Sequence, residues 1–231
     1  MDFIEGEIIL INKDTGWTSF DVVNKIRYIL RSGLSVKKIK VGHAGTLDPL
    51  ATGLLVVCTG KATKSIMNIQ DSQKEYVADF MFGKTTPSFD RETEVDQFYE
   101  TGHIDIASIE KTIEMFTGKI MQVPPVYSAV KVNGTRAYKH ARKGDTPVLR
   151  PREVEINRIE ILDNNFPLMK FRIVCGKGTY IRALARDFGQ ATGSGAYLET
   201  LCRTRIGNYQ LNDALSISEF EDKISGLRIL L

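Results

Sequence analysis

The chain has 231 residues, a formal net charge of +3, and 42% hydrophobic and 26% charged residues. A chain of this length can bury a sizeable core in one large domain or two small ones, and the composition is typical of globular proteins. No apolar run reaches the ~18 residues needed to cross a bilayer. The first five residues carry acids where a secretory signal would carry Lys or Arg. We therefore expect a cytoplasmic protein without a membrane segment.

Neither the cysteines nor the histidines show the spacing of a metal site. Cys58, Cys175 and Cys202 are odd in number and far apart, without a C-x-x-C pair. We expect them to be reduced and mostly buried. The three histidines lack an H-x-x-x-H or similar spacing, so we expect no metal ligands among them.

Hydrophobic patterning predicts interleaved strands and helices in the first half of the chain. The apolar run at 6–12 predicts a strand, and Thr18 or Ser19 can cap a helix that ends at Gly33. Further along, the pattern predicts strands at 53–58 and 76–82, a helix that begins within 61–69, and a helix capped by Asp105 and stopped by Gly118.

The second half begins with a hairpin, because the Asn133-Gly134 pair favours a tight turn between 126–132 and 135–138. The remaining predicted elements are strands at 154–162, 169–175 and 203–211, a helix at 180–188 capped by Thr179 and closed by Gly189, and a short terminal helix with Ser218 and Glu221 as its capping box. Strands and helices do not alternate strictly, which favours a mixed, largely antiparallel α+β sheet. A single domain over residues 1–231 is the simplest organisation.

Positive charge gathers in the segment 121–152. Its cationic residues are Lys131, Arg136, Lys139, Arg142, Lys143, Arg150 and Arg152, against the single acid Asp145. The segment therefore carries +6 and the rest of the chain −3. A basic segment on a slightly acidic body is typical of polyanion binding. Two interleaved tyrosines favour nucleic acid over the alternative, a hairpin whose charges only aid solubility.

The loop at 41–53 (VGHAGTLDPLATG) holds a histidine and an aspartate just before a predicted buried strand. Asp48 precedes Pro49, and Asp-Pro is a common turn signal, so Asp48 could simply form an Asx turn. The alternative is a functional carboxylate presented by a turn-rich loop. The residues alone leave both interpretations open.

A second candidate segment, at 175–182 (CGKGTYIR), runs from a predicted strand through a glycine turn into a helix. A helix N-terminus with Lys177 and Arg182 nearby can hold a phosphate or fix a carboxylate. The alternative is an ordinary turn with a solvated Lys and a surface Arg. Tyr76 and Tyr180 are likewise more common as core or edge aromatics than as catalytic groups.

Five segments together carry a family resemblance. They are GHAGTLDPLATG at 42–53, Tyr76, PPVYSAVK at 124–131, KGTYIR at 177–182, and GAYL with LCRTR within 195–205. In this order they resemble the TruB family, the bacterial tRNA pseudouridine-55 synthases, and they cover nearly the whole chain. The resemblance implies the pseudouridine-synthase fold and a cofactor-free isomerisation. In that reaction the N1–C1′ bond of a uridine breaks, and the base rejoins the ribose through C5.

The resemblance also implies roles for particular residues. Asp48 would be the nucleophile that forms a covalent adduct, which suits a carboxylate because it is a charged nucleophile and a competent leaving group. Arg182 would pair with Asp48 and orient it. Tyr76 would stack on the uracil and take part in proton transfer. Tyr180 would border the pocket and help exclude water.

The expected substrate is tRNA, whose target uridine must be flipped out of the T loop at a cost of roughly a few kcal/mol. His43 resembles the histidine that fills the space left by flipped bases, and the segment 121–152 resembles the family's thumb, which closes over the T stem-loop. The residues expected to contact RNA are His43, Lys131, Arg136, Lys139, Arg142, Lys143, Lys177 and Arg203. We expect a monomer without an obligate protein partner.

Two features depart from the family pattern. Family members commonly carry a C-terminal PUA domain, for which residues 211–231 are too few, and the glycine usual after the acid matched by Asp90 is missing. Three alternatives remain: a non-catalytic RNA-binding or tRNA-folding protein, a pseudouridine synthase with another RNA target, and a metal-dependent nuclease. Simple binding needs no carboxylate near phosphate, and a nuclease would need a second clustered carboxylate. A guide-directed enzyme would depend on a larger assembly.

Overall fold

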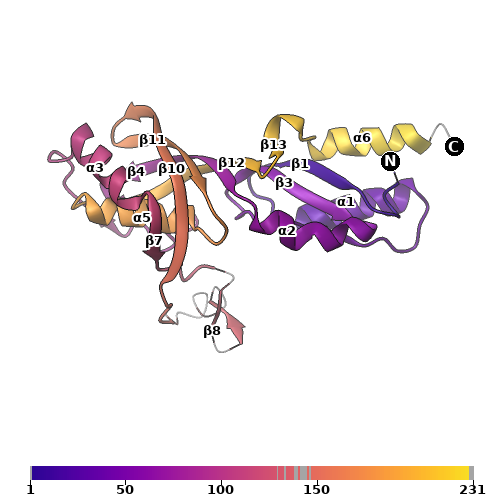
Figure 1. The fold of residues 1–231 in the computed structure, drawn as a ribbon, viewed down its shortest axis with the longest axis horizontal. Coiled ribbons are helices and arrows are strands. Elements are labelled where there is room, and N and C mark those ends of the chain that lie inside the picture. Colours follow the sequence, from indigo (N-terminus) through magenta and orange to yellow (C-terminus); the bar gives the residue numbers. More distant parts are fainter. Residues whose placement is uncertain are drawn as a thin grey trace. The chain divides into compact units, whose positions relative to one another are not determined.

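The computed structural model describes residues 2–128, 130–132, 134–137, 140, 145 and 147–228, with the backbone alone at 131, 227 and 228. The chain divides into two compact units (Figure 1). Unit 1 comprises Met1–Tyr76 and Cys202–Leu231, and unit 2 comprises Val77–Leu201.

Unit 1 is a small sheet between helices. Its elements are β1 (Ile8–Lys13), α1 (Ser19–Gly33), β2 (Val41–His43), β3 (Thr52–Thr59), the 3₁₀ helix η1 (Gly60–Ser65), α2 (Ile66–Asp71), the start of β4 (Lys74–Phe82), the end of β12 (Ala196–Ile206), β13 (Tyr209–Gln210), the 3₁₀ helix η2 (Leu211–Asp213) and α6 (Ile217–Arg228). Strand β3 is central: β1 and β2 pair with it antiparallel, and β12 pairs with it parallel.

The apolar run in β3 explains why this unit has helices on both faces of its sheet. Successive strand residues point to opposite faces, and every residue from Gly53 to Thr59 is buried. Leu55 and Val57 pack in one core cluster with α1 and α6, whereas Leu54, Val56 and Cys58 belong to a second cluster with Ile69 of α2 (Figure 1). A strand buried on both faces reads as a continuous apolar run.

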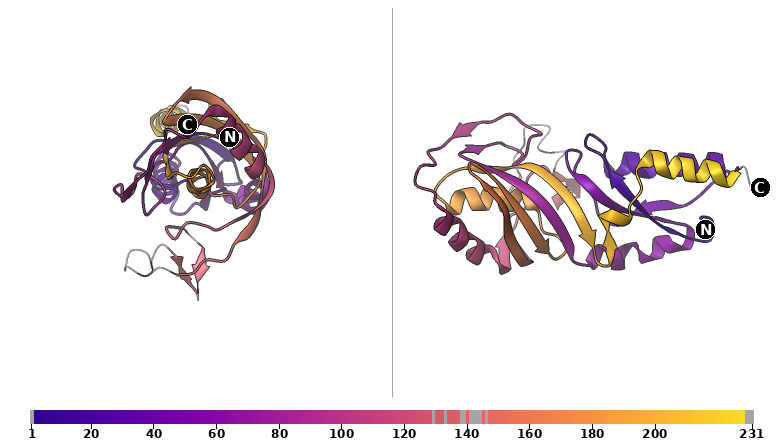
Figure 2. Two further views of the ribbon diagram at one scale, coloured as in Figure 1. Left: turned by 90° about the vertical axis from the view of Figure 1, so that its left-hand side faces the viewer. Right: turned by 90° about the horizontal axis from the view of Figure 1, so that it is seen from above.

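Unit 2 contains the larger part of the sheet and the thumb. Its elements are the rest of β4, β5 (Lys84–Thr85), β6 (Gln97–Phe98), α3 (Ile106–Phe116), β7 (Gly118–Gln122), β8 (Lys131–Val132), β9 (Thr135–Arg136), β10 (Arg152–Asn165), β11 (Leu168–Cys175), α5 (Ile181–Ala191) and the start of β12. The sheet order in this unit is β12-β4-β11-β10-β7. Strand β10 pairs antiparallel with β11 and β7, and Figure 2 shows these strands side by side and strongly twisted.

Aromatic packing fixes α5 and α3 on the sheet of unit 2. The Phe188 ring of α5 lies 5.6 Å from Phe80 of β4 and 5.7 Å from Phe171 of β11, centroid to centroid. Phe116 at the end of α3 stacks on Phe188 at 5.3 Å. Such pairs add about 0.5–1.5 kcal/mol each beyond their buried area. Helix α5 is therefore anchored at Phe188, near its C-terminal end.

Two predicted helix starts are confirmed by the structure. Helix α1 begins after Thr18, whose side chain accepts a hydrogen bond from Asp21 N while the Asp21 carboxylate accepts from Thr18 N. Helix α3 begins after Asp105, which forms the same reciprocal pair with Ser108. The mixed, largely antiparallel α+β sheet is also confirmed.

The predicted limits of α5 are wrong at both ends. Thr179 is not the cap, because its hydroxyl donates to Gly176 O and the helix begins only after Tyr180. Gly189 does not close the helix, which runs on to Ala191. It lies against the backbone of Ala196, whose N would be 2.2 Å from a Cβ at position 189. The glycine therefore serves close packing rather than helix termination.

The predicted positions of the last strand and of the C-terminal capping box are also wrong. The last long strand, β12, begins at Ala196 and not at Arg203, and it turns at Gly207 into the short β13. The capping box of α6 is Ser216 with Glu219, two residues before the predicted pair. Strand β7 was not predicted, because it is short and only Ile120 and Met121 in it are apolar.

The predicted thumb hairpin is shorter than expected. Strands β8 and β9 pair Lys131 with Arg136 and Val132 with Thr135, whereas residues 126–128 form bends instead of strand. Asn133 and Tyr138 lie outside the described residues. In the part of the chain that the structure describes, no helix is both long and apolar enough to cross a membrane.

Candidate active site

Asp48 lies in unit 1, on the loop between β2 and β3. The carbonyl of Asp48 accepts a hydrogen bond from Ala51 N (3.1 Å), which closes a turn around Pro49. Ser19, at the start of α1, fixes the preceding residue twice: its hydroxyl donates to Leu47 O (3.1 Å) and accepts from Leu47 N (2.8 Å). The turn therefore exists as the Asp-Pro signal predicted, and it is held by contacts outside the loop.

Two fully buried cations bind the backbone of this loop. Lys13, at the end of β1, donates from Nζ to Pro49 O (3.3 Å), and Arg203 of β12 donates from Nη2 to Gly45 O (3.1 Å). The side chains are among the largest that are fully buried, with Lys13 0% and Arg203 1% exposed. Sequence reasoning missed Lys13, because an isolated Lys after a strand is normally solvated.

The burial of Arg203 contradicts its expected role as an RNA-binding residue. Its Nε donates to Leu54 O (2.8 Å) and its Nη1 to Thr46 O (3.4 Å). A guanidinium group that is 1% exposed and bound to backbone carbonyls offers no surface to a phosphate. Arg203 is a structural cation of the Asp48 loop.

His43 and Tyr76 are the other predicted site residues of unit 1. His43 ends β2 and is half-buried, and Tyr76 lies on β4 with 9% exposure. Burial lowers the pKa of His43, and the nearby positive charge of Arg203 lowers it further, against a hydrogen bond with the Gly45 backbone that raises it. A neutral imidazole suits stacking on bases better than pairing with phosphate.

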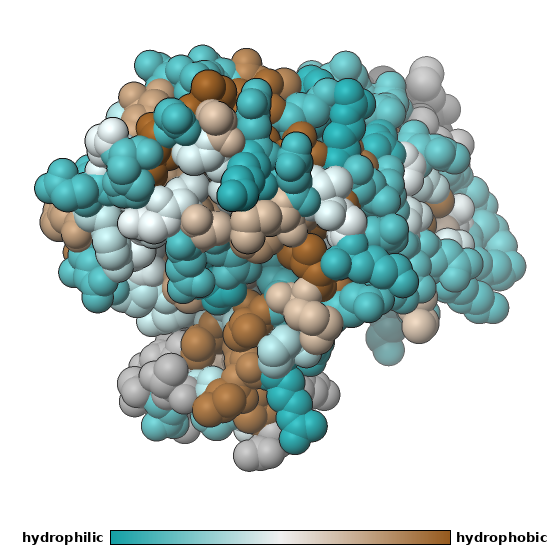
Figure 3. All heavy atoms as spheres, turned by 60° about the vertical axis from the view of Figure 1, so that its left-hand side comes forward, coloured by the Kyte–Doolittle hydropathy of each residue, from teal (hydrophilic) through white to brown (hydrophobic). Residues whose placement is uncertain are grey.

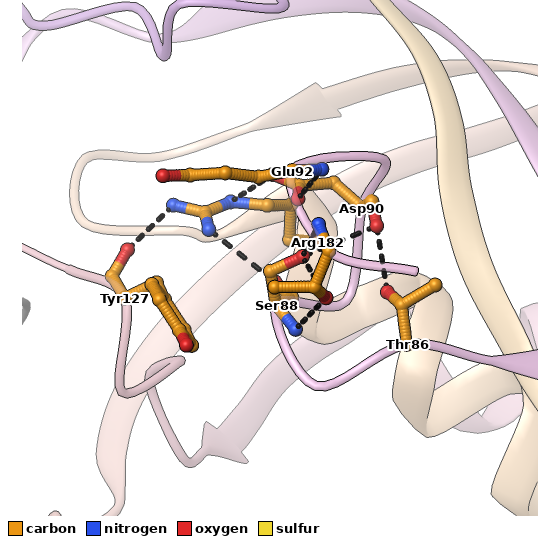
Figure 4. Close-up of polar contacts among 7 residues, drawn as sticks. Thr86, Ser88, Asp90, Glu92, Tyr127 and Arg182 are labelled. Atoms are coloured by element: carbon orange, nitrogen blue, oxygen red, sulfur yellow. Dashed lines mark hydrogen bonds and ion pairs between the residues drawn. The ribbon is translucent and has the colours of Figure 1, made fainter. Parts of the chain in front are cut away.

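Arg182 in unit 2 holds two loops together (Figure 4). Its Nη1 donates to Ser88 O (3.3 Å) and its Nη2 to Tyr127 O (2.9 Å), while its Nε lies 3.4 Å from Oδ2 of Asp90. The side chain is 4% exposed. Arg182 is thus a buried residue and not the surface Arg of the alternative interpretation. The ion pair also gives Asp90 a local role without the glycine usual after it.

Tyr180 begins α5 and is held through its backbone by Gln122, the last residue of β7. The Gln122 amide accepts from Tyr180 N (2.8 Å) and donates to Tyr180 O (3.2 Å), and Gln122 is 1% exposed. This reciprocal pair replaces the side-chain cap that the sequence predicted at Thr179. Lys177, in the turn before the helix, is exposed, as an RNA contact requires.

The thumb is described only in part. Arg136 on β9 is exposed, whereas Lys139, Arg142 and Lys143 lie outside the described residues, as does the side chain of Lys131. Exposed apolar side chains lie near both ends of the thumb segment: Met121 is 65%, Val123 37% and Val148 92% exposed. Figure 3 shows hydrophobic residues gathered on this side of the molecule.

The predicted catalytic residues are therefore divided between the two units. Asp48 and Tyr76 belong to unit 1, and Arg182 and Tyr180 belong to unit 2. Among the described residues, no group of three or more His, Cys, Asp or Glu side chains is placed to hold a metal ion. The chemistry available to these residues is nucleophilic, acid–base and electrostatic.

Comparison with known proteins identifies the family. The N-terminal domain of the TruB family of pseudouridylate synthases matches residues 31–181. The chain belongs to the TruB family. A tRNA pseudouridine synthase B from Parabacteroides distasonis is 55% identical over 222 residues, which are 96% of this chain and 94% of that protein. The Flavobacterium johnsoniae protein of the same name is 48% identical over 224 residues, covering 96% of this chain and 98% of its own.

Solved structures agree with this assignment of the TruB fold. One chain of a Cbf5–Nop10–Gar1 complex superimposes with a TM-score of 0.72 at 30% identity, over 95% of this chain and 54% of its own length. A chain of an H/ACA RNP bound to a substrate RNA containing 2′-deoxyuridine gives a TM-score of 0.69 at 27% identity, again over 95% and 54%. This TruB chain spans about half the length of those two chains.

Proposed function

We propose that this protein converts uridine 55 in the T loop of tRNA to pseudouridine, with Asp48 as the nucleophile. Membership of the TruB family and relatives named tRNA pseudouridine synthase B at 55% identity support pseudouridine formation in tRNA. A tRNA substrate implies work in the cytoplasm. We further propose that both units form one catalytic domain over residues 1–231, with the thumb as an insertion.

The Asp48 loop is the observation that carries the proposal. Buried side chains fix the backbone immediately before and after Asp48, through Ser19 on Leu47 and Lys13 on Pro49. A nucleophile must be held in one orientation to gain the entropic advantage of an intramolecular attack. A mere surface turn needs no such fixation.

The other residues follow the roles that the family resemblance implies. Asp48 bonds to the nucleotide and the N1–C1′ bond breaks. C5 of the rotated base then bonds to C1′, the Asp48 carboxylate leaves, C5 loses its hydrogen as a proton and N1 gains one. Tyr76 stacks on the uracil, and Arg182 pairs with and orients Asp48. Tyr180 borders the pocket, and a neutral His43 fills the space left by the flipped base. Flipping costs roughly a few kcal/mol, which contacts to the extruded base must offset.

The thumb and the turn before α5 supply the RNA contacts in this proposal. The exposed cations Lys177 and Arg136 suit phosphate contacts, together with Lys131, Lys139, Arg142 and Lys143. Phosphate contacts position a folded RNA, and they make affinity depend on salt. The enzyme needs no cofactor and no protein partner for this reaction, and a monomer suffices.

Tritium release tests the proposal directly, because C5 loses its hydrogen only when the base is rejoined through C5. A T stem-loop RNA with 5-tritiated uridine at position 55 is incubated with the wild type, Asp48→Asn and Asp48→Ala. We expect release by the wild type alone, with RNA binding retained by both variants. The matched control is Asp105→Asn, which makes the same change at a helix cap where Asn works as well as Asp.

The outcomes separate the alternatives. Near-normal release by an Asp48 variant means that another group is the nucleophile. Binding without release by the wild type favours a non-catalytic tRNA-binding protein on the same scaffold. Release from full-length tRNA that persists when uridine 55 is replaced by cytidine indicates another target uridine.

The thumb is tested by its salt dependence. Replacing Lys139, Arg142 and Lys143 with Ala should weaken RNA binding and lower the log–log salt slope by about one for each phosphate that is no longer neutralised. An unchanged slope would show that these residues do not touch RNA.

A further inference from the structure

Unit 1 surrounds the Asp48 loop with two cations that are completely buried, which is unusual for Lys and Arg. A buried ammonium or guanidinium loses its hydration, at a cost that hydrogen bonds only partly recover. Neutral side chains could bind the same carbonyl oxygens without that cost. The presence of two positive charges therefore calls for a physical reason.

Lys13 binds the side of the loop that follows Asp48. Besides Pro49 O, its Nζ contacts Trp17 O (2.7 Å) and Asp14 O (3.0 Å), so it ties the turn after β1 to the residue next to Asp48. Pro49 O also accepts from Gly16 N (2.8 Å). This one ammonium group thus joins two turns around the carboxylate.

Arg203 binds the side of the loop that precedes Asp48. Its guanidinium group reaches the carbonyls of Gly45, Thr46 and Leu54. Its own backbone is fixed against β3, because Arg203 pairs with Gly53. A Cβ at Gly53 would lie 2.4 Å from Arg203 O, and Gly53 has a φ of +98°. The guanidinium group is therefore rigidly held where it meets the loop.

The two cations also act on one another and on Asp48. Burial lowers the pKa of Lys13 to about 8; the negative charges of Asp48 and Asp14 oppose this shift, and the positive charge of Arg203 adds to it. Lys13 is thus close enough to Asp48 to sense its charge. Charges interact more strongly inside a protein than in water.

We propose that Lys13 and Arg203 are positioning residues of the reaction: they hold the loop on either side of Asp48, and their charge stabilises the attacking carboxylate. This inference rests on the proposed role of Asp48 as nucleophile. It gives the two buried charges a function that neutral hydrogen-bond donors could not supply. The exposed Asp14 carboxylate, which also faces Lys13, lies on the other turn.

The test compares charge with shape at both positions. Lys13→Met removes the charge and keeps the length, whereas Lys13→Arg keeps the charge. Arg203→Lys keeps the charge but removes the forked donor geometry. Single-turnover tritium release is measured from pH 5 to 9 with enzyme in excess over the T stem-loop RNA, alongside the RNA dissociation constant. The single tryptophan, Trp17, reports folding of unit 1.

We expect Lys13→Met to bind RNA normally and to react at least about tenfold more slowly at pH 7, as misplaced reacting groups do. The wild-type rate should fall above about pH 8, where Lys13 loses its proton, and Lys13→Met should lack this basic limb. Lys13→Arg should lack it too, because an arginine keeps its charge. Arg203→Lys should lower the rate without moving the limb.

Controls separate positioning from general stability. Ile26→Val makes a small cavity in the α1 core of the same unit, where Ile26 is 0% exposed, and Lys25→Met removes a partly exposed cation that is paired with Glu221. Both should keep the wild-type profile. Asp48→Ala in the same series tests the nucleophile itself.

Different results refute the proposed function and the proposed role of Lys13 and Arg203. Activity in Asp48→Ala, or none in the wild type, refutes the proposed function. An inactive Asp48→Ala beside a Lys13→Met enzyme with the wild-type limb refutes the role of the Lys13 charge alone. If Lys13→Met does not fold, a wild-type basic limb in the folded Lys13→Arg enzyme refutes that role. Wild-type rates in Arg203→Lys refute positioning by the guanidinium fork.

Discussion

Burial of the Lys13 ammonium group should make the stability of unit 1 depend on pH in a way that Lys13→Met abolishes. The folded protein binds the Lys13 proton less tightly than the unfolded chain, with a pKa of about 8 against 10.5. Between these values the unfolded state holds more protons, so stability rises with pH. This contribution of Lys13 to the stability is complete above the pKa of the unfolded chain, and it is lost as the pH falls through the pKa of the folded protein.

The expected size follows from the two pKa values. A shift from 10.5 to about 8 corresponds to a total of about 3 kcal/mol, which is the cost of the protonated group at pH 7. Between pH 7 and pH 9 only part of this is recovered, about 1 kcal/mol. For a chain of this size that equals a change of about 2–4 °C in the unfolding midpoint. Lys13→Met lacks the titrating group and should lack this gain.

Urea unfolding followed by Trp17 fluorescence measures the stability of unit 1, which contains Lys13. Trp17 accepts the Lys13 hydrogen bond through its carbonyl and packs against the α1 core. The measured quantity is the stability difference between wild type and Lys13→Met at pH 7 and pH 9, in which other titrating groups cancel. Lys25→Met, with a partly exposed amine, should follow the wild type. A difference that stays constant with pH would refute the reasoning, since Lys13 would then keep its proton.

Three further outcomes follow from packing and burial. Gly53→Ala should lower stability by at least about 3 kcal/mol, seen as a lower urea midpoint, because the new Cβ collides with Arg203 O; a midpoint like the wild type's would contradict the register of β3 with β12. Asp90→Asn should cost about 3 kcal/mol in urea unfolding followed by circular dichroism, which also detects unit 2, because it removes the carboxylate from the buried Arg182 guanidinium group; no change would mean that the pair contributes little. In the native protein, iodoacetamide should label Cys202 faster than the buried Cys58 and Cys175, as measured by mass spectrometry. In urea all three should be labelled equally. Equal rates in the native protein would contradict the burial of Cys58 and Cys175.

Local signals predicted the parts of the fold that depend on neighbouring residues. The Thr18 and Asp105 caps are confirmed because each bonds only to residues within its own first turn. The predicted cap at Thr179 failed because Gln122, 58 residues away from Tyr180, already holds the start of α5. Gly189 failed as a stop because its purpose is contact with β12. Contacts of this kind are invisible in a local pattern.

The candidate site was likewise predictable only where it depends on residues close together in the sequence. The loop with Asp48 and the turn with Arg182 stand out in the sequence because their motifs are contiguous. The environment that makes them special comes from distant residues, since Arg203 reaches Gly45 from 158 positions away. Lys and Arg are expected on surfaces, so the sequence led us to place Arg203 on RNA and to overlook Lys13. Only the folded chain distinguishes a buried cation from a solvated one.

This distinction suggests a division of labour between exposed and buried positive charge. An attacking carboxylate near RNA meets a strongly negative environment, and salt screens exposed cations within about 10 Å. Cations enclosed by protein, such as Lys13 and Arg203, are screened much less, so their proposed effect on Asp48 should depend little on the salt concentration. In the proposed complex the thumb cations act instead through counterion release. If both proposals hold, added salt weakens RNA binding while the rate within the bound complex stays constant. The cost of burying the two cations is then a cost of keeping the chemistry independent of the ionic surroundings.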